Sequence, residues 1–272
     1  MPTSESKRAE DQAEFRSAFD AQMRGPLAMK MPEGGDEEMD GPICRSWGWS
    51  PRGFVMTSDL SGLDGAQLDA LIERQVGFFA GRREAFEWKT YSHDQTADLV
   101  GRLVQAGFLP EERESLVIGR VGDIDLTAQA PPGVTLREVH SRNDTDRMAE
   151  LLTLVDSDDR SFLSEAFFKA AAANPGDVVL LVAETDGQVV STARVNLVPG
   201  NQFATLWAGS THPDWRHQGI YRATVAYRGR LAAKRGRRYL QVDATEASRP
   251  ILERLGFLTV ATTTPYIWSP PS

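Results

Sequence analysis

The feature of this sequence that most constrains its fold is a pattern that occurs twice. Residues 94–109 (DQTADLVGRLVQAGFL) align without gaps on residues 243–258 (DATEASRPILERLGFL), and each segment follows a predicted long helix and a strand. Both end in a short helix stopped by Gly-Phe. A repeat of this kind indicates two copies of one unit that share a core. We therefore expect a pseudo-duplicated fold; the alternative is that helix-Gly-Phe is only a common helix stop.

The first half begins with a predicted amphipathic helix over residues 10–23, because Phe15, Phe19 and Met23 recur at a spacing of four. The acidic, glycine-rich segment 31–42 indicates a solvated loop. The hydrophobic pattern then predicts strands at 53–58, 85–91 and 116–121 and helices at 63–82 and 96–106. Residues 123–133, which contain Pro-Pro-Gly, indicate a linker.

The second half has the pattern of an α/β (α+β) fold, a central mixed β-sheet flanked by helices. Strands are expected at 134–140, 177–184, 188–197, 203–211, 238–244 and 259–268, and helices at 145–155, 161–173, 219–235 and 249–255. Asp186-Gly187 predicts a hairpin between two of these strands. We predict three parts: an N-terminal helix with a flexible acidic segment (1–45), a first half (46–130) and a second half (131–272).

Composition excludes several classes of protein. With 30 Lys+Arg against 38 Asp+Glu the net charge is −8 over 272 residues, which argues against general binding of nucleic acid. No run of 18 apolar residues predicts a membrane span, and the first residues lack the apolar core of a secretory signal, so we expect a cytoplasmic protein. Cys44 is the only cysteine and the four histidines form no H-x-x-x-H pair, so we expect neither an intrachain disulfide nor a metal site.

The most informative segment is residues 211–238, where a predicted strand passes through a tight turn at residues 216–219 into a long helix. Gly219 allows a ligand to approach the backbone closely, and the amides of residues 217–221 would lie unpaired at the helix start, which is an anion-binding arrangement. No acidic residue occurs from 215 to 242. The cations there are Arg216, Arg222, Arg228, Arg230, Lys234, Arg235, Arg237 and Arg238. We predict a phosphate-bearing ligand; the alternative is a solvated basic helix.

The motif Arg216-x-x-Gly219-x-Tyr221, after Pro213, resembles the pyrophosphate-binding motif of the GNAT superfamily of N-acetyltransferases. The order of hairpin, third strand, basic helix, strand and short helix ending in LERLGF extends the resemblance over residues 134–268, and more faintly over 53–121. The P-loop and G-x-G-x-x-G patterns are absent. The doubled pattern resembles tandem members with two GNAT-like halves. No Arg-x-x-Gly turn precedes the helix at 63–82, so we expect a degenerate first half that binds no cofactor.

This resemblance implies that acetyl-CoA is the acyl-donor substrate and that the amine of a small molecule is the acceptor. The acetyl group would be transferred by direct attack of the amine on the thioester. It implies that the end of the strand at 203–211 pairs with the pantetheine, that the turn holds the pyrophosphate and that Arg222 meets the 3′-phosphate. The implied CoA-binding residues are Gly209, Ser210, Thr211, Arg216, His217, Gln218, Gly219, Ile220, Tyr221, Arg222 and Thr245.

The chain departs from the family pattern in three places. The second small residue of the turn is Tyr221. Thr245 and Leu252 stand where the family often has an asparagine and a tyrosine that protonates the leaving thiolate. The strand at 203–211 carries no Glu, Asp or His to act as general base. We name Asp243 as the first candidate base and Tyr221 as the first candidate acid; the alternatives are a turn or cap residue and a packing residue.

The acceptor is poorly specified by the sequence. Three acids, Asp156, Asp158 and Asp159, could hold a cationic amine or form an exposed charged loop. Two other functions remain open: a CoA-binding sensor or regulatory protein that no longer transfers acyl groups, and a nucleic-acid-binding module that uses the basic helix. The sequence leaves a monomer and a homodimer equally open.

Overall fold

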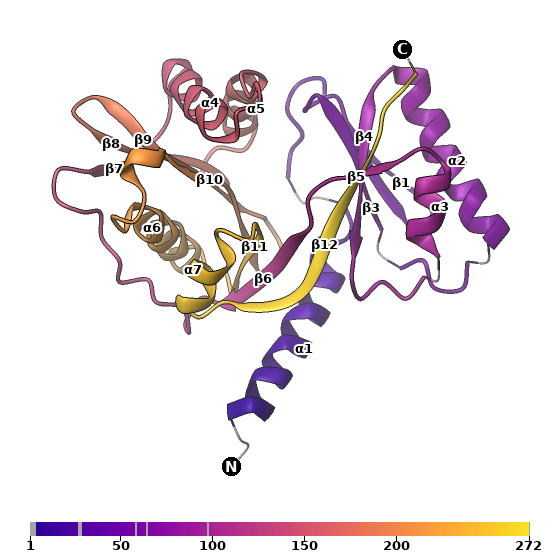
Figure 1. Cartoon of the computed structure of the whole chain (residues 1–272), viewed down its shortest axis with the longest axis horizontal. Coiled ribbons are helices and arrows are strands. Elements are labelled where there is room, and N and C mark those ends of the chain that lie inside the picture. Colours follow the sequence, from indigo (N-terminus) through magenta and orange to yellow (C-terminus); the bar gives the residue numbers. More distant parts are fainter. Residues whose placement is uncertain (1–3, 27–28, 58, 64, 97, 272) are drawn as a thin grey trace.

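The computed structural model describes residues 4–26, 29–57, 59–63, 65–96 and 98–271. Within them, one mixed sheet runs through the molecule and helices flank it, as Figure 1 shows. The predicted mixed α/β architecture with two similar halves is confirmed. Positions 58, 64 and 97 of the predicted strand 53–58 and helices 63–82 and 96–106 lie outside the described residues.

The first half supplies three helices and six strands of the described chain. They are α1 (Ser4–Met23), β1 (Asp36–Asp40), β2 (Ile43–Trp47), β3 (Arg52–Thr57), α2 (Gly65–Arg82), β4 (Ala85–Tyr91), α3 (Leu99–Gln105), β5 (Leu109–Pro110) and β6 (Glu114–Arg120).

The second half follows the linker. Its elements are β7 (Thr135–Glu138), α4 (Arg142–Asp156), α5 (Phe162–Ala173), β8 (Val178–Thr185), β9 (Gln188–Leu197), β10 (Phe203–Thr211), the short 3₁₀ helix η1 (Pro213–Trp215), α6 (Ile220–Lys234), β11 (Tyr239–Ala244), α7 (Arg249–Arg254) and β12 (Leu258–Trp268).

The order of strands in the sheet is symmetric about its centre. It runs β1-β2-β3-β4-β12-β6-β11-β10-β9-β8-β7. Read from the β12–β6 pair outward, each side has one antiparallel pair, then a parallel pair (β3 with β4, β10 with β11), then antiparallel pairs. Among the described strands, only β7 and the two-residue β5, which pairs with β12 outside this order, lack a counterpart. The two halves therefore share one topology and are related by a pseudo-twofold axis between β12 and β6.

The two halves exchange strands across this axis. Strand β6 belongs to the first half in the chain, yet it pairs with β11 of the second half, while β12 pairs with β4 of the first half. The two exchanged strands pair with each other from Leu258↔Ile118 to Thr263↔Glu114. Each half is therefore completed by a strand from the other, and the sheet is continuous.

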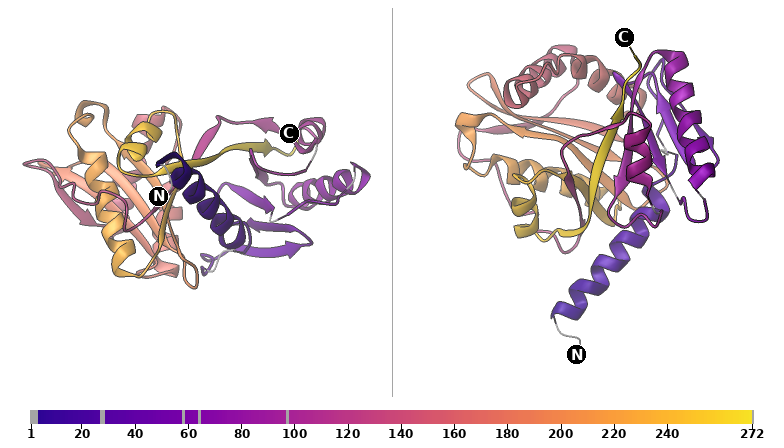
Figure 2. Two further views of the ribbon diagram at one scale, coloured as in Figure 1. Left: turned by 90° about the horizontal axis from the view of Figure 1, so that it is seen from below. Right: turned by 45° about the vertical axis from the view of Figure 1, so that its right-hand side comes forward.

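Helix α1 covers the junction between the halves, as the two views in Figure 2 show. Phe15 and Phe19 are buried, and they lie edge-on to Tyr239 of β11 and Tyr91 of β4. The predicted spacing of four was correct, although the helix begins earlier, at Ser4. Burying two aromatic side chains against both halves contributes several kcal/mol to keeping them together.

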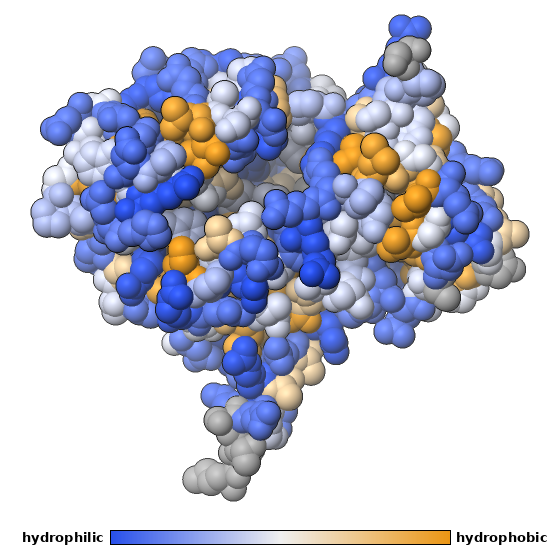
Figure 3. All heavy atoms as spheres, in the orientation of Figure 1, coloured by the Kyte–Doolittle hydropathy of each residue, from blue (hydrophilic) through white to orange (hydrophobic). Residues whose placement is uncertain are grey.

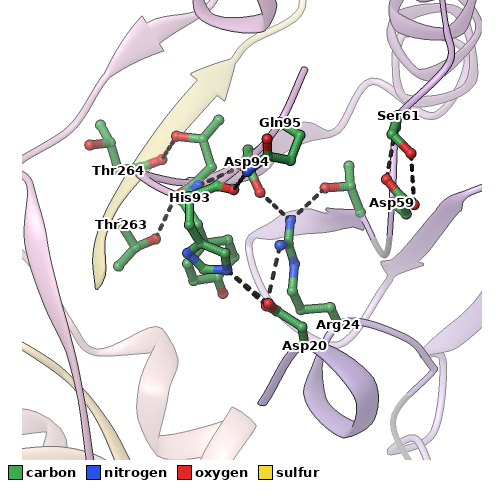
Figure 4. A network of polar contacts seen from close by, with 12 residues as sticks. Asp20, Arg24, Asp59, Ser61, His93, Asp94, Gln95, Thr263 and Thr264 are labelled. Carbon is green, nitrogen blue, oxygen red and sulfur yellow. Dashed lines mark hydrogen bonds and ion pairs between the residues drawn. The ribbon is translucent and has the colours of Figure 1, made fainter. Parts of the chain in front are cut away.

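A buried arginine after α1 connects this helix to β3 and to the segment that follows β4 (Figure 4). Arg24, one residue beyond the end of α1, donates to Asp94 Oδ1 (2.6 Å), Thr57 Oγ1 (3.0 Å) and Asp20 Oδ1 (3.4 Å). His93 Nε2 lies 2.9 Å from Asp20 Oδ1. Burial opposes ionisation of Asp20, but these two neighbours outweigh it and lower its pKa.

The prediction of a solvated loop over residues 31–42 is wrong, because β1 lies inside it and β2 follows at once. Strand β1 (DEEMD) has no buried residue, so it carries no hydrophobic alternation that a sequence pattern could detect. It is held by backbone pairing with β2, by the Arg45–Glu38 ion pair and by Gln75 Nε2, which donates to Asp40 Oδ2. A short, charged strand of this kind is typical of a sheet edge.

Candidate active site

The central feature of the site is an opening between two parallel strands. β10 and β11 pair only from Phe203↔Tyr239 to Thr205↔Gln241, and beyond that point β10 continues beside β9 alone. Trp207 pairs with Arg194 and Ser210 with Thr192, so two residues of β10 oppose one residue of β9. This bulge bends β10 and leaves its edge toward β11 unpaired.

The ring of Tyr221 lies in this opening. A Cβ atom placed on Gly209 of β10 would lie 3.0 Å from Tyr221 Cε2, so a side chain there would crowd the ring. The hydroxyl group of Tyr221 interacts with Ser248 beside α7. Burial raises the pKa of Tyr221 above its ordinary value, against smaller effects of Arg228 and Ser248, so the phenol stays protonated at neutral pH.

The turn before α6 presents free backbone amides. His217 (φ 63°) and Gly219 (φ 84°) are both left-handed, and nothing lies within 4 Å of a Cβ placed on Gly219. In the described chain, no amide from residue 217 to 222 donates to a protein acceptor; Ala223 is the first, to the Gly219 carbonyl. Six unpaired amides at the positive end of a 15-residue helix are an arrangement suited to an anion, and the binding of one here stays a prediction.

The basic block is dispersed by the fold. Near the turn, Arg216 Nε donates to the Thr211 carbonyl (3.2 Å), and Arg222 is exposed, 3.7 Å from Asp125 Oδ2. The other arginines contact distant parts of the chain: Arg228, Arg230 and Arg237 donate to backbone carbonyls, and Arg235 and Arg238 pair with Asp177 and Glu14. Of the basic block, Arg216 and Arg222 therefore lie near the turn, whereas the five other arginines hold the fold together, and the predicted phosphate-bearing ligand stays a prediction.

The structure accounts for the remaining predicted CoA-binding residues. Ser210 and Thr211 lie on the part of β10 that pairs with β9 alone, where Ser191 Oγ donates to the Ser210 carbonyl (2.6 Å). Ile220 is buried and anchors the start of α6 in the core. Gln218 Nε2 donates to the Asp214 carbonyl (3.3 Å), and Thr245 is exposed where β11 ends. The structure thus brings the predicted turn, strand end and Thr245 around one opening.

Asp243 is paired with the other half of the molecule. Its Oδ2 lies 2.5 Å from Nζ of Lys89 on β4, and its Oδ1 accepts from Gln241 Nε2 at 3.0 Å. Burial alone would lower the pKa of Lys89, but the neighbouring carboxylates, Asp243 foremost, raise it above its ordinary value. Both carboxylate oxygens of Asp243 are therefore engaged by donors. The catalytic role of Asp243 stays a prediction.

A second carboxylate, Glu114 at the start of β6, lies beside this pair and was missed by sequence reasoning. Its Oε2 is 3.7 Å from Lys89 Nζ, and 27% of its side chain is exposed. Its pKa is raised to about 7, and burial is the largest cause. The charge of Lys89 lowers the pKa by a smaller amount, and the charge of Asp243 raises it. Glu114 shares a sheet face with Asp243, since Leu116, two residues along β6, is paired with Asp243. No local motif marks this residue, because strand exchange alone brings it here.

Leu252 and the acidic loop have structural roles. Leu252 is completely buried in the core of the second half and presents no polar group to the opening. Arg160 pairs with Asp156 and lies 3.9 Å from Asp158, and Asp159 Oδ1 accepts from the Ser161 amide. Asp156 and Asp159 are thus each engaged through one carboxylate oxygen, and the binding of a cationic amine by these acids stays a prediction.

Figure 3 shows the surface hollowed between the two halves. No cluster of three or more potential metal ligands occurs in the described ranges. Among the helices that the structure describes, none combines the length and apolar character needed to cross a membrane.

The comparison that decides the family is with family models. Residues 145–257 match the model described as the acetyltransferase (GNAT) family. These residues form a GNAT acetyltransferase domain. They run from α4 to the end of α7 and include β10, the turn, α6 and β11. The recognition of the GNAT superfamily from the sequence is confirmed.

Solved structures extend the GNAT likeness over both halves. A GCN5-related N-acetyltransferase from Kribbella flavida has a TM-score of 0.66 at 19% identity, and the alignment covers 96% of each chain. A tandem GNAT protein from the clavulanic acid biosynthesis pathway, solved without AcCoA, has a TM-score of 0.61 at 12% identity and covers 96% of this chain and 95% of that one. At these identities they share the fold. No curated protein matches the sequence.

Proposed function

We propose that this protein is an acyl-CoA-dependent N-acyltransferase that moves an acetyl group from acetyl-CoA to the amine of a small molecule. The observation that carries the proposal is the set of six unpaired amides at residues 217–222 beside the opening between β10 and β11. In a GNAT domain these two features suit one elongated ligand, with its diphosphate on the turn and its thioester arm between the strands.

The residues of this chain fit such a donor. The amides of the turn would bind the diphosphate oxygens, and Arg222, whose side chain is 55% exposed, is free to swing toward the 3′-phosphate. The free edge of β10 from Gly209 to Thr211 would pair with the amides of the pantetheine arm. A backbone amide of that edge, aimed at the thioester oxygen, would stabilise the developing oxyanion by roughly 3–4 kcal/mol.

Two side chains would handle the protons. The amine nitrogen bonds to the thioester carbon, the carbon–sulfur bond breaks, and the nitrogen loses one proton. We assign this proton to Glu114, directly or through one water, because Asp243 is already held by Lys89 and Gln241. Tyr221, neutral and inside the opening, would give its proton to the leaving thiolate.

The reach of Glu114 is compatible with this role. Paired strands are about 4.8 Å apart, so a thioester in the wider gap between β10 and β11 would be at least roughly 7 Å from the axis of β6, before the side chain of Glu114 is counted. That side chain points to the same face as Asp243. An amine on this face would therefore lie within one water of the Glu114 carboxylate.

A second function, CoA binding without transfer, is favoured by one observation. Leu252, buried in the core, cannot supply the acid that the family often has at this position. Titration calorimetry with acetyl-CoA, followed by thiol detection of CoA release across polyamines, aminoglycosides, amino acids and peptides, separates the two. Binding with amine-dependent release supports the transferase. Binding without release from any amine supports the sensor, and no binding contradicts both.

A further inference from the structure

Arg194, on β9, carries a charge that the protein does not balance. Its Nε donates to Asn196 Oδ1 (2.8 Å), and its guanidinium lies 5.9 Å from the centre of the Phe167 ring on α5. No described carboxylate lies within ion-pairing distance, and no described residue accepts from its two Nη atoms. Burial lowers the pKa of Arg194 to about 10, and no neighbouring acid opposes this effect.

Other buried charged groups of the molecule have partners of opposite charge. Asp243 pairs with Lys89, and Glu87 pairs with Arg52 of β3 (2.9 Å). An arginine removed from water without a counter-ion is costly, so most partly buried arginines have a carboxylate partner. Arg194 is thus a cation without a counter-ion in the described chain.

Arg228 lacks a carboxylate as well, but its donors are already engaged. It is 1% exposed and donates to the carbonyls of Thr224 (3.0 Å), Arg194 (3.2 Å) and Trp207 (3.3 Å). It lies on the α6 side of the sheet, where it holds the bulge of β10. Arg194 differs because it is partly exposed and keeps two donors free.

The position of Arg194 relates it to the proposed acyl transfer. Arg194 is directly paired with Trp207 of β10, so both side chains project from the same face of the sheet. Trp207 is 45% exposed, although its Nε1 donates to Thr205 Oγ1 (2.7 Å). Thr205 is in turn paired with Gln241, two residues before Asp243. One face therefore presents, in order, a free guanidinium, an exposed indole and the Asp243–Glu114 carboxylates.

We propose that this face binds an acceptor that carries an anionic group as well as its amine, and that Arg194 binds the anion. This inference rests on the proposed function, because the proposed acyl transfer places the reacting amine at the opening between β10 and β11. The opening is about one and a half strand spacings, roughly 7 Å, from β9. Together with the several ångströms that the Arg194 side chain reaches, an amine and a carboxylate or phosphate a few bonds apart, as in an amino acid, cover that distance, with Trp207 against the carbon chain between them.

The experiment compares acceptors that differ only in their charge. CoA release from acetyl-CoA is measured with glycine against glycinamide, β-alanine against β-alaninamide, 4-aminobutyrate against its amide, and phosphoethanolamine against ethanolamine. We expect the anionic member of at least one pair to have the higher kcat/KM by about tenfold or more. The carboxylate pairs and the phosphate pair show which anion is bound.

Arg194→Gln should lower kcat/KM for the favoured anionic acceptor by about tenfold or more and change that for its neutral partner less than about twofold. Arg194→Lys, which keeps the charge, should retain part of the preference even if Arg194→Gln folds poorly. The matched control is Arg142→Gln, an exposed arginine on α4 paired with Asp146, which should change neither.

Two outcomes overturn the inference: a wild-type protein that prefers the neutral member of every pair or neither member, and an Arg194→Gln variant that loses both activities equally. Failure of the proposed function would give a different experimental result. In that case the wild-type protein would release CoA with no probe at all, neutral amines included, and the inference would fall with the function.

Discussion

Lys89 Nζ lies 2.5 Å from Asp243 Oδ2, so an ion pair joins the first half of the chain to β11, one of the two strands that border the opening. The side chains are only 13% and 9% exposed. The pair joins β4 to β11 across the two exchanged strands, β12 and β6, that lie between them in the sheet. The first half thereby helps to fix β11, one wall of the opening in the second half.

Breaking this pair should destabilise the whole protein. Lys89→Met leaves Asp243 buried without its cation, and we expect the free energy of unfolding to fall by about 3–5 kcal/mol. Urea denaturation followed by circular dichroism measures it. The double variant with Asp243→Asn should recover part of the loss, because no charge is left unpaired. A loss below about 1 kcal/mol in Lys89→Met would show that the pair is not structural.

Gly219→Asp should abolish CoA binding and leave the fold intact. The new carboxylate would stand in the space at the turn, where nothing lies within 4 Å, and repel the diphosphate. The control is Gly200→Asp, in the turn between β9 and β10, which has a similar φ (75° against 84°) and similar open space. Calorimetry with CoA should show binding in the control alone. Equal affinity in both variants would contradict the assignment of the turn.

The pH dependence of transfer should report on Glu114. Only the carboxylate accepts a proton, and burial holds its pKa at about 7, so the rate should rise with pH through 7 and level off above it. In Glu114→Gln we expect a rate lower by about 10²–10⁴-fold and the loss of this rise. Glu111→Gln is the control, since Glu111 pairs with Arg52 at a distance from the opening. An unchanged pH profile in Glu114→Gln would exclude it as the base.

The same carboxyl should link stability to pH. Its ordinary pKa is 4.5 and its folded pKa is about 7, so between these values the folded protein holds a proton that the unfolded chain has lost. The stabilisation is complete below pH 4.5 and is lost as the pH rises through 7. Urea denaturation at pH 5 and pH 8 should therefore show a smaller loss of stability in Glu114→Gln than in the wild-type protein. An equal loss in both would mean that Glu114 titrates normally.

Tyr221→Phe should slow transfer while CoA binding stays unchanged. The ring would still fill the space beside Gly209, but the proton for the leaving thiolate would be missing. We expect a decrease on the order of 10²-fold, the low end for general acid catalysis. Tyr227→Phe is the control, because its hydroxyl donates to Glu138 (3.0 Å) away from the opening. If CoA affinity falls as much as the rate, Tyr221 is a packing residue.

Much of the fold was determined by the local sequence. The strand at Phe203–Thr211 was predicted with its observed bounds, as was the one at Ala85–Tyr91. The first begins with a run of four buried residues, and the second was read from the alternation of AFEWKTY. The turn at Gly219 was also predictable, since the residue types of a left-handed turn at a helix start are local. Strand β1 was not, because an edge strand held by backbone pairing needs no apolar pattern.

What only the tertiary structure decided is which residues complete the site. The duplicated segment indicated two similar halves, but nothing local showed that β6 would cross into the second half and bring Glu114 beside Asp243. Likewise, eight cations near one turn suggested a single phosphate site, whereas packing turned residues such as Arg228 inward to bind carbonyls. Hydrophobic periodicity and turn chemistry act over a few residues, but strand pairing and the partner of a charge depend on segments far apart in the chain.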